Sequence, residues 1–275
     1  MNTANKPQLP IGVFDSGVGG LTVLKALREE LPHEDLIYLG DTARLPYGTK
    51  SPASISRYAC QAARLLQQRD IKLLVVACNT ASAVALDALR AQLQPLPVIG
   101  VVGPGASAAV AARPGGRHLV LATEATVRLG AYRRAILELD PLASVQELAC
   151  ELLVSLAEEG WNDGAIPAAI IDRYLASLGA AAAGLNSVIL GCTHFPLLRD
   201  AISAAFAAGV SVVDSASTTA AVARERLQAL GLANPVDHEG SLTLLATDGT
   251  ARFARVGGWF LGKKLSAEDV TLVDL

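Results

Sequence analysis

The sequence lacks the features of several protein classes. Charged residues make up only 18% of its 275 residues, the net charge is −3, and no long basic run occurs. We therefore expect no nucleic-acid partner, because binding a phosphate backbone requires clustered Lys and Arg. A small anionic ligand is not excluded, since it needs only a few local donors.

Long apolar runs are also missing. No stretch approaches the roughly 20 apolar residues of a membrane-spanning helix, and residues 1–10 contain no apolar segment of a signal peptide. No membrane association is expected. The four cysteines are too few for a disulfide framework in a chain of this length, and they include no C-x-x-C pair. Free thiols in a reducing cytosol fit this pattern, so the predicted location is cytoplasmic.

Apolar residues are abundant, at 51%, and their pattern alternates between strands and helices. Strands are expected at 10–14, 36–39, 73–77, 97–102, 119–122, 145–149, 187–191, 210–213 and 242–246. Helices are expected at 21–31, 52–69, 79–93, 127–139, 166–178, 197–207, 215–230 and 250–260. This alternation predicts an α/β fold of mostly parallel sheets flanked by helices. Gly103-Pro104-Gly105 is expected to break the chain at a crossing between two domains.

Two cysteines occupy matching places in this pattern. Cys78 follows the apolar run 73–77 and precedes Asn79 and Thr80, while Cys192 follows the run 187–191 and precedes Thr193 and His194. Ligands of parallel sheets bind at the carboxyl ends of strands, where both cysteines fall. The repeat suggests an internal duplication that places two thiols on opposite sides of one substrate.

The simplest alternative is that the cysteines are small buried apolar residues. We adopt this interpretation for Cys60, on a helix face, and for Cys150, beside a strand. Cys78 and Cys192 differ because each precedes a helix, whose dipole is expected to favour the thiolate.

Other chemistries fit less well. Cys192-Thr193-His194 is too tightly spaced for a zinc site, and the other histidines form no cluster, so no metal is expected. Gly17-Val18-Gly19-Gly20 is only a weak dinucleotide signal, and no lysine suggests a Schiff base, so no cofactor is expected. A thiol hydrolase remains open, because Cys with His is a nucleophile–base pair, but it would leave one cysteine unexplained.

Two thiols on opposite faces of one carbon suit a different reaction. One, as thiolate, removes a proton while the other, as thiol, delivers a proton to the opposite face. This general acid–base chemistry inverts a stereocentre without a cofactor.

At these residues the sequence resembles the glutamate racemase family. The matching motifs span most of the chain and are Gly12-Val13-Phe14-Asp15-Ser16-Gly17-Val18-Gly19-Gly20-Leu21-Thr22, Tyr38-Leu39-Gly40-Asp41-Thr42-Ala43-Arg44-Leu45-Pro46-Tyr47-Gly48, Ala77-Cys78-Asn79-Thr80-Ala81 and Gly191-Cys192-Thr193-His194-Phe195-Pro196-Leu197-Leu198.

The resemblance implies cofactor-independent interconversion of L- and D-glutamate, supplying D-glutamate for peptidoglycan. It implies that Cys78 acts on the proton of the D-isomer and Cys192 on that of the L-isomer, with Asp15 and His194 tuning the thiols and Glu158 as a carboxylate partner of His194. The implied substrate contacts are Asp15, Ser16, Tyr47, Gly48, Asn79, Thr80, Thr193 and His194. The implied architecture is a homodimer of chains with two pseudo-symmetric α/β domains, 1–102 plus 214–275 and 103–213, and the active site in the cleft between them.

The chain departs from the family pattern in two places. Residues 150–158 read Cys-Glu-Leu-Leu-Val-Ser-Leu-Ala-Glu, without the two prolines common in the family, so the path of this segment does not follow from the resemblance. Ala125 replaces a common glycine, which leaves Thr126 a weak substrate-contact candidate.

Several alternatives stay open at this point. His194 could be a core histidine, Asp15 a helix cap, Tyr47 a loop-packing residue and Glu158 a solvated charge at a helix end. The chain could also racemise aspartate, or bind an amino acid without catalysis.

Overall fold

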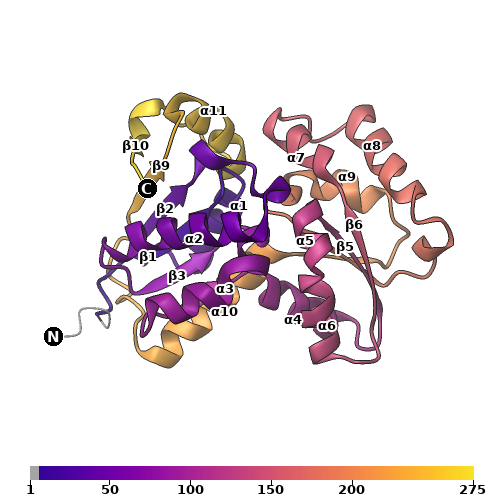
Figure 1. Cartoon of the computed structure of the whole chain (residues 1–275), viewed down its shortest axis with the longest axis horizontal. Coiled ribbons are helices and arrows are strands. Elements are labelled where there is room, and N and C mark those ends of the chain that lie inside the picture. Colours follow the sequence, from indigo (N-terminus) through magenta and orange to yellow (C-terminus); the bar gives the residue numbers. More distant parts are fainter. Residues whose placement is uncertain (1–5) are drawn as a thin grey trace.

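The computed structural model describes residues 6–275 and contains two parallel sheets flanked by helices (Figure 1). The first sheet has six strands in the order β10-β9-β2-β1-β3-β4, and the second has four in the order β6-β5-β7-β8. The strands are β1 (Ile11–Asp15), β2 (Leu36–Gly40), β3 (Leu73–Val76), β4 (Val98–Gly100), β5 (Arg117–Ala122), β6 (Ser144–Ala149), β7 (Ser187–Gly191), β8 (Ser211–Asp214), β9 (Leu242–Ala246) and β10 (Val270–Leu272). The expected α/β class is confirmed.

Each sheet is buried by the helices that connect its strands. The helices are α1 (Leu21–Glu30), α2 (Pro52–Gln67), α3 (Asn79–Leu93), α4 (Val102–Ala112), α5 (Glu124–Leu129), α6 (Ala131–Leu139), α7 (Glu151–Glu158), α8 (Ala165–Ala176), α9 (Arg199–Ala204), α10 (Ser215–Leu230) and α11 (Thr250–Leu261). Short 3₁₀ turns include η3 (Tyr47–Thr49) and η5 (Phe195–Leu198). Strands β1, β3, β5 and β7 are almost wholly buried, which explains their continuous apolar sequences.

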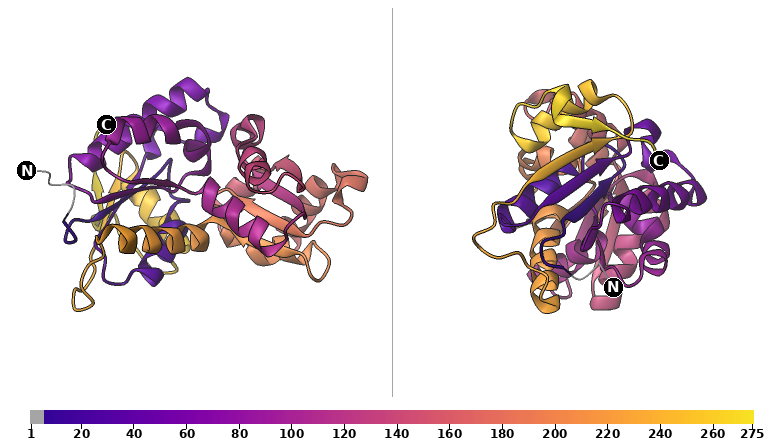
Figure 2. Two further views of the ribbon diagram at one scale, coloured as in Figure 1. Left: turned by 90° about the horizontal axis from the view of Figure 1, so that it is seen from below. Right: turned by 90° about the vertical axis from the view of Figure 1, so that its left-hand side faces the viewer.

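Interior strands of the two sheets carry the cysteine segments. β3 pairs in parallel with β1 and β4, and β7 pairs in parallel with β5 and β8. The carboxyl ends of β3 and β7 therefore each have a neighbouring strand on both sides. Figures 1 and 2 show the two sheets side by side along the longest axis of the molecule.

The chain passes between the two sheets more than once. After β8, helix α10 packs against α1 and α4, and β9 and β10 then join the first sheet beside β2. Figure 2 shows α10 running beneath the first sheet. The C-terminal segment therefore packs with the N-terminal strands.

Several predicted boundaries were wrong. Gly103-Pro104-Gly105 does not break the chain but lies in the first turn of α4, where backbone N–H groups have no intrahelical acceptor to lose. The strand predicted at 97–102 ends at Gly100, because α4 already begins at Val102. The helix predicted at 127–139 is two helices, separated by Gly130 in the left-handed region at φ 58°.

Two further elements differ from the prediction. The segment predicted as a helix at 197–207 is a 3₁₀ turn followed by the shorter helix α9. Strand β10 was not predicted at all. Within residues 6–275, no helix has the length and apolar character needed to cross a membrane.

Candidate active site

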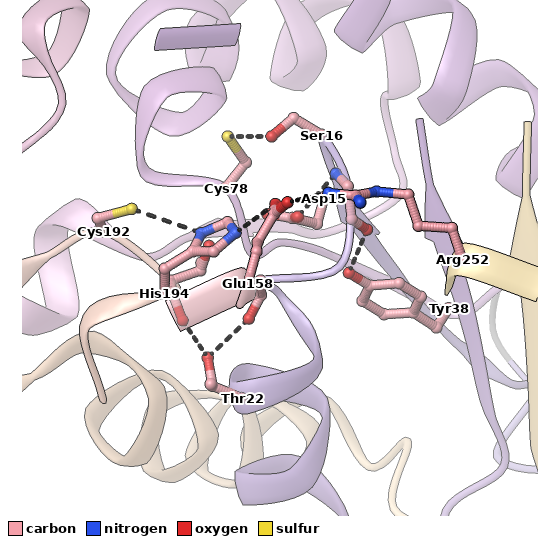
Figure 3. A network of polar contacts seen from close by, with 12 residues as sticks. Asp15, Ser16, Thr22, Tyr38, Cys78, Glu158, Cys192, His194 and Arg252 are labelled. Atoms are coloured by element: carbon pink, nitrogen blue, oxygen red, sulfur yellow. Dashed lines mark hydrogen bonds and ion pairs between the residues drawn. The ribbon is translucent and has the colours of Figure 1, made fainter. Parts of the chain in front are cut away.

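The two cysteine strand ends open onto one small cavity of about 50 Å³. Its wall contains Cys78 and Cys192 together with Ser16, Pro46, Tyr47, Gly48, Asn79, Thr80, Thr123, Glu151, Val154, Thr193 and His194. The structure therefore brings together thiols that are far apart in the sequence. Figure 3 shows both cysteines on the same side of the polar network, beside Ser16 and His194.

Cys78 follows β3 and is the N-cap residue of α3. The Ala81 N–H donates to Cys78 Sγ at 3.4 Å, and the thiol donates to Ser16 Oγ at 3.5 Å. The sulfur is thus held by one backbone amide of α3 and one hydroxyl from the loop after β1.

The environment of Cys78 favours the thiol. Burial, followed by the nearby Asp15 carboxylate, raises the pKa of Cys78 to about 12, while its hydrogen bonds with Ser16 and Ala81 lower it only in part. The expectation that the helix start would favour the thiolate at Cys78 was therefore wrong. Desolvation and a like charge outweigh the dipole effect.

Asp15 lies behind this wall, at the end of β1, and is fully buried. One carboxylate oxygen accepts a hydrogen bond from Gly17 N–H at 2.8 Å, and the other has no partner among residues 6–275. Burial raises the pKa of Asp15 above its usual value. The residue sits close enough to influence Cys78 electrostatically but does not itself line the cavity.

Cys192 has a different set of partners. Its Sγ lies 3.7 Å from His194 Nδ1, and His194 Nε2 lies 3.1 Å from Glu158 Oε1. Arg252 donates to the other Glu158 oxygen at 2.7 Å. Figure 3 shows the resulting chain from Cys192 through His194 and Glu158 to Arg252.

This network favours the protonated imidazole. Burial alone would lower the pKa of His194, but hydrogen bonds with Cys192 and Glu158, and their charges, raise it to about 10. The hydrogen bond from His194 in turn lowers the pKa of Glu158. His194 thus lines the cavity with a pKa raised by its neighbours, unlike an isolated core histidine, whose pKa burial would lower.

Helix α11 supplies contacts that the sequence did not reveal. It carries Arg252, and the Phe260 ring packs edge-on against the His194 ring with centroids 5.3 Å apart. No sequence motif links Arg252 and Phe260 to Cys192, because α11 follows β9 of the first sheet, whereas Cys192 follows β7 of the second. Their role became visible only in three dimensions.

The loop after β1 also contacts the second cysteine segment directly. A Cβ at Gly19 would clash with the side chains of Thr193 and His194, and Thr22 Oγ1 donates to the Thr193 carbonyl at 2.9 Å. The glycine-rich turn therefore provides close packing between the two strand ends.

Most of the predicted substrate contacts line the cavity. They are Ser16, Tyr47, Gly48, Asn79, Thr80, Thr193 and His194, whereas the remaining predicted contact, Asp15, is absent from the wall, as is Glu158, the predicted partner of His194. Tyr47 is only 1% exposed, so it is not a surface loop residue, and its hydroxyl donates to Asp41 at 2.6 Å.

Three threonines extend the polar side of the cavity. Thr80 lies 2.9 Å from Thr123 and 3.3 Å from Thr126, measured between hydroxyl oxygens. Thr123 occupies the place in the second sheet that Asp15 occupies in the first, and this internal repeat was the signal that could have identified it. Thr126 is buried behind Thr80 and Thr123 and is absent from the cavity wall.

The segment that departs from the family pattern forms α7. Glu151 and Val154 line the cavity, and Glu158 is the last residue of the helix. The Glu151 carboxylate accepts a hydrogen bond from Glu124 N–H at the start of α5. The missing prolines therefore do not prevent Glu158 from reaching His194.

Comparisons with known proteins agree with this geometry. Residues 11–223 match the family model described as Asp/Glu/Hydantoin racemase. A glutamate racemase from Geobacter metallireducens is 49% identical over 98% of both chains. The chain belongs to the glutamate racemase family. A second relative, a glutamate racemase from Syntrophus aciditrophicus, is 42% identical over 95% of this chain and 96% of the other.

Solved structures give the same result for the fold. Glutamate racemase from Francisella tularensis subsp. tularensis in complex with D-glutamate superposes with a TM-score of 0.89 at 34% identity, covering 98% of both chains. The enzyme from Thermus thermophilus in complex with β-chloro-D-alanine gives 0.87 at 43% identity, also over 98% of both chains. The chain is thus an amino-acid racemase with the architecture of these enzymes.

Proposed function

We propose that this chain interconverts L- and D-glutamate by a two-base mechanism in which Cys78 and Cys192 act on opposite faces of the α-carbon. The observation that carries the proposal is that both thiols line one cavity whose wall also contains the hydroxyls of Ser16, Thr80, Thr123 and Thr193 and the amide of Asn79. Those donors suit a substrate with two carboxylates.

The unequal environments of the sulfurs support different roles at the start of the reaction. In this proposal Cys192, whose Sγ lies 3.7 Å from His194, is the base for L-glutamate, and Cys78, whose pKa is raised, is the acid. Cys192 removes the α-proton of L-glutamate while Cys78 delivers its proton to the opposite face, giving D-glutamate, a Cys192 thiol and a Cys78 thiolate. The reverse reaction starts from those states, and proton exchange with solvent restores the first pair.

No cofactor takes part in this proposal. Ser16, Asn79, Thr80 and Thr193 hold the carboxylates, and Asp15 and Glu158 act through the residues in front of them. Asp15 keeps Cys78 protonated, and Glu158 keeps His194 charged.

The cavity is too small for a bound substrate in this state. Its volume of about 50 Å³ is well below the roughly 300–1,000 Å³ of ligand pockets. We propose that residues 1–102 plus 214–275 and residues 103–213 form two domains that separate to admit glutamate. X-ray scattering with and without glutamate would detect a change in the radius of gyration.

Circular dichroism tests the central proposal. L-glutamate mixed with dialysed protein, without added cofactor, should lose its signal as the racemate forms, and D-glutamate should do the same from the opposite sign. Aspartate serves as the second substrate and should react much more slowly. A glutamate signal that never decays would refute the proposal.

The cellular role is part of the same proposal. The chain acts in the cytoplasm as a homodimer that supplies D-glutamate for peptidoglycan. Rescue of a bacterium that requires D-glutamate for growth tests the supply role, and sedimentation of the purified protein tests the dimer.

A further inference from the structure

Tyr132 links the two cysteine segments from a position that neither motif includes. It lies on α6, is fully buried, and its hydroxyl donates to Asn79 Oδ1 at 2.6 Å. Asn79 is the residue after Cys78. One end of this side chain therefore reaches the first thiol segment.

The ring of Tyr132 touches the second thiol segment. A Cβ at Gly191, the residue before Cys192, would lie 3.1 Å from the ring, and one at Gly105 in α4 would lie 3.2 Å from it. Both distances are shorter than ordinary van der Waals contact, so a larger residue at either position would require the ring or its neighbours to shift. Tyr132 thus packs on the Cys192 strand while its hydroxyl reaches the residue beside Cys78.

The hydrogen bond from the Tyr132 hydroxyl occupies the Asn79 amide oxygen and leaves the amide nitrogen free to donate. Asn79 lines the cavity, and its Nδ2 is buried with no partner in the part of the chain that the structure describes. Burial raises the pKa of the Tyr132 hydroxyl, so this group keeps its proton and can donate to Oδ1. The two amide hydrogens are then left as donors, whereas a flipped amide would present an acceptor to a carboxylate.

We infer that Tyr132 is a positioning residue. Its hydroxyl fixes the Asn79 amide with the NH₂ group toward a substrate carboxylate, and its ring, packed on the Cys192 strand, keeps this amide at a fixed place relative to that strand. This inference rests on the proposed function for the identity of the carboxylate. Tyr132 itself does not line the cavity and acts through Asn79.

Tyr132→Phe tests the inference because it removes only the hydroxyl and keeps the ring. The expected result is a rise in the KM for glutamate of roughly 10-fold in both directions, with kcat changed by less than about 3-fold, because the lost contact orients a binding group. The matched control is Tyr174→Phe, which removes a hydroxyl that accepts from Leu152 N–H at 3.0 Å outside the cavity. KM of the control should match that of the unmodified protein.

A double-mutant cycle separates positioning from general stability. If Tyr132 acts through Asn79, Tyr132→Phe should raise KM no further when Asn79 is already Ala. Additive effects on KM in the cycle, or an unchanged KM in Tyr132→Phe, would overturn the inference. Melting temperatures of all variants show whether any loss comes from unfolding.

Asn79→Asp gives an answer that does not depend on how Tyr132→Phe folds. The ionised aspartate still accepts from Tyr132 but offers no donor to the substrate and adds a negative charge beside its carboxylate, so it should raise KM more than Asn79→Ala. A tolerated Asn79→Asp would contradict the assigned amide orientation. If the unmodified protein does not racemise glutamate, the proposed function fails, and glutamate binding by calorimetry still tests the same variants.

Discussion

The two cysteine strand ends look alike in sequence but differ in the groups that control their protons. Both thiols are only 5% exposed, and both follow a buried strand. Cys78 is surrounded by its own half of the molecule, with Ser16, Ala81 and Asp15 nearby. Cys192 lies beside His194, which in turn contacts Glu158. Helix α11, which packs with the first sheet, contacts both of these residues through Phe260 and Arg252.

This difference shows that a duplicated motif does not give two thiols with equal surroundings. Burial and a neighbouring carboxylate keep Cys78 protonated, whereas a protonated histidine lies beside Cys192. A reversible two-base reaction needs one thiol and one thiolate at a time.

The largest effects are expected from the thiols themselves. Cys78→Ser and Cys192→Ser should each reduce kcat by roughly 10³-fold or more, since a positioned acid or base contributes about 10²–10⁴-fold. Cys60→Ser, outside the cavity, is the matched control and should retain full activity. Full activity in either test variant would disprove the two-base mechanism.

Solvent deuterium sharpens this test. Cys78→Ser keeps the base assigned to the L-isomer, so slow deuterium uptake at Cα is expected in L-glutamate without inversion. Cys192→Ser should show the same behaviour with D-glutamate. NMR of the recovered amino acid measures the exchange, and the opposite pattern would reverse the assignment of the two sulfurs.

Smaller losses are expected when the partners of Cys192 change. His194→Asn removes the cation and should lower kcat by about 10²-fold, and Glu158→Gln should lower it by about 10-fold because it removes the charge that holds the imidazolium. Initial rates by circular dichroism measure both variants. Equal rates for Glu158→Gln and the unmodified protein would remove Glu158 from the mechanism.

The raised pKa of His194 predicts how stability depends on pH. Its pKa is raised in the folded protein from the ordinary 6.5 to about 10, so the folded state binds more protons than the unfolded state between these values. The stability it contributes is fully present below about pH 6.5 and is lost as pH rises toward 10. The slope is at most about 1.4 kcal/mol per pH unit.

Urea unfolding at several pH values measures this slope. His194→Asn is the comparison and should show a flatter decline between about pH 7 and pH 9. Cys78 adds a decline in the same direction at higher pH, because its pKa is raised from 9.0 to about 12. Parallel curves for the two proteins below pH 9 would contradict the ion pair of His194 with its neighbours.

The smallest effect is expected at Arg252. Its side chain is 55% exposed, and exposed ion pairs contribute roughly 0–1 kcal/mol, so Arg252→Gln should lower kcat by no more than about 5-fold. The control is Arg255→Gln on the same helix, which packs over Trp259 away from the cavity. If Arg255→Gln lowers kcat more than Arg252→Gln does, the effect of Arg252 cannot be assigned to its ion pair with Glu158.

Local sequence patterns predicted most of the fold. Buried parallel strands have continuous apolar sequences, and residues such as Ser51 and Pro52 mark a helix start by local chemistry. The pattern failed at Gly103-Pro104-Gly105, since turn-forming residues are also tolerated in the first turn of a helix. A Cβ at Gly105 would lie 3.2 Å from the Tyr132 ring, a close approach that no local pattern reveals.

The sequence by itself determined the two strand-end cysteines and the hydroxyl and amide donors that follow them, because these lie within a few residues of each other. Only the tertiary structure decided which sulfur keeps its proton and which lies beside a cation. Burial and charge act through space, and the groups responsible, such as Asp15, Glu158 and Arg252, come from segments far apart along the chain.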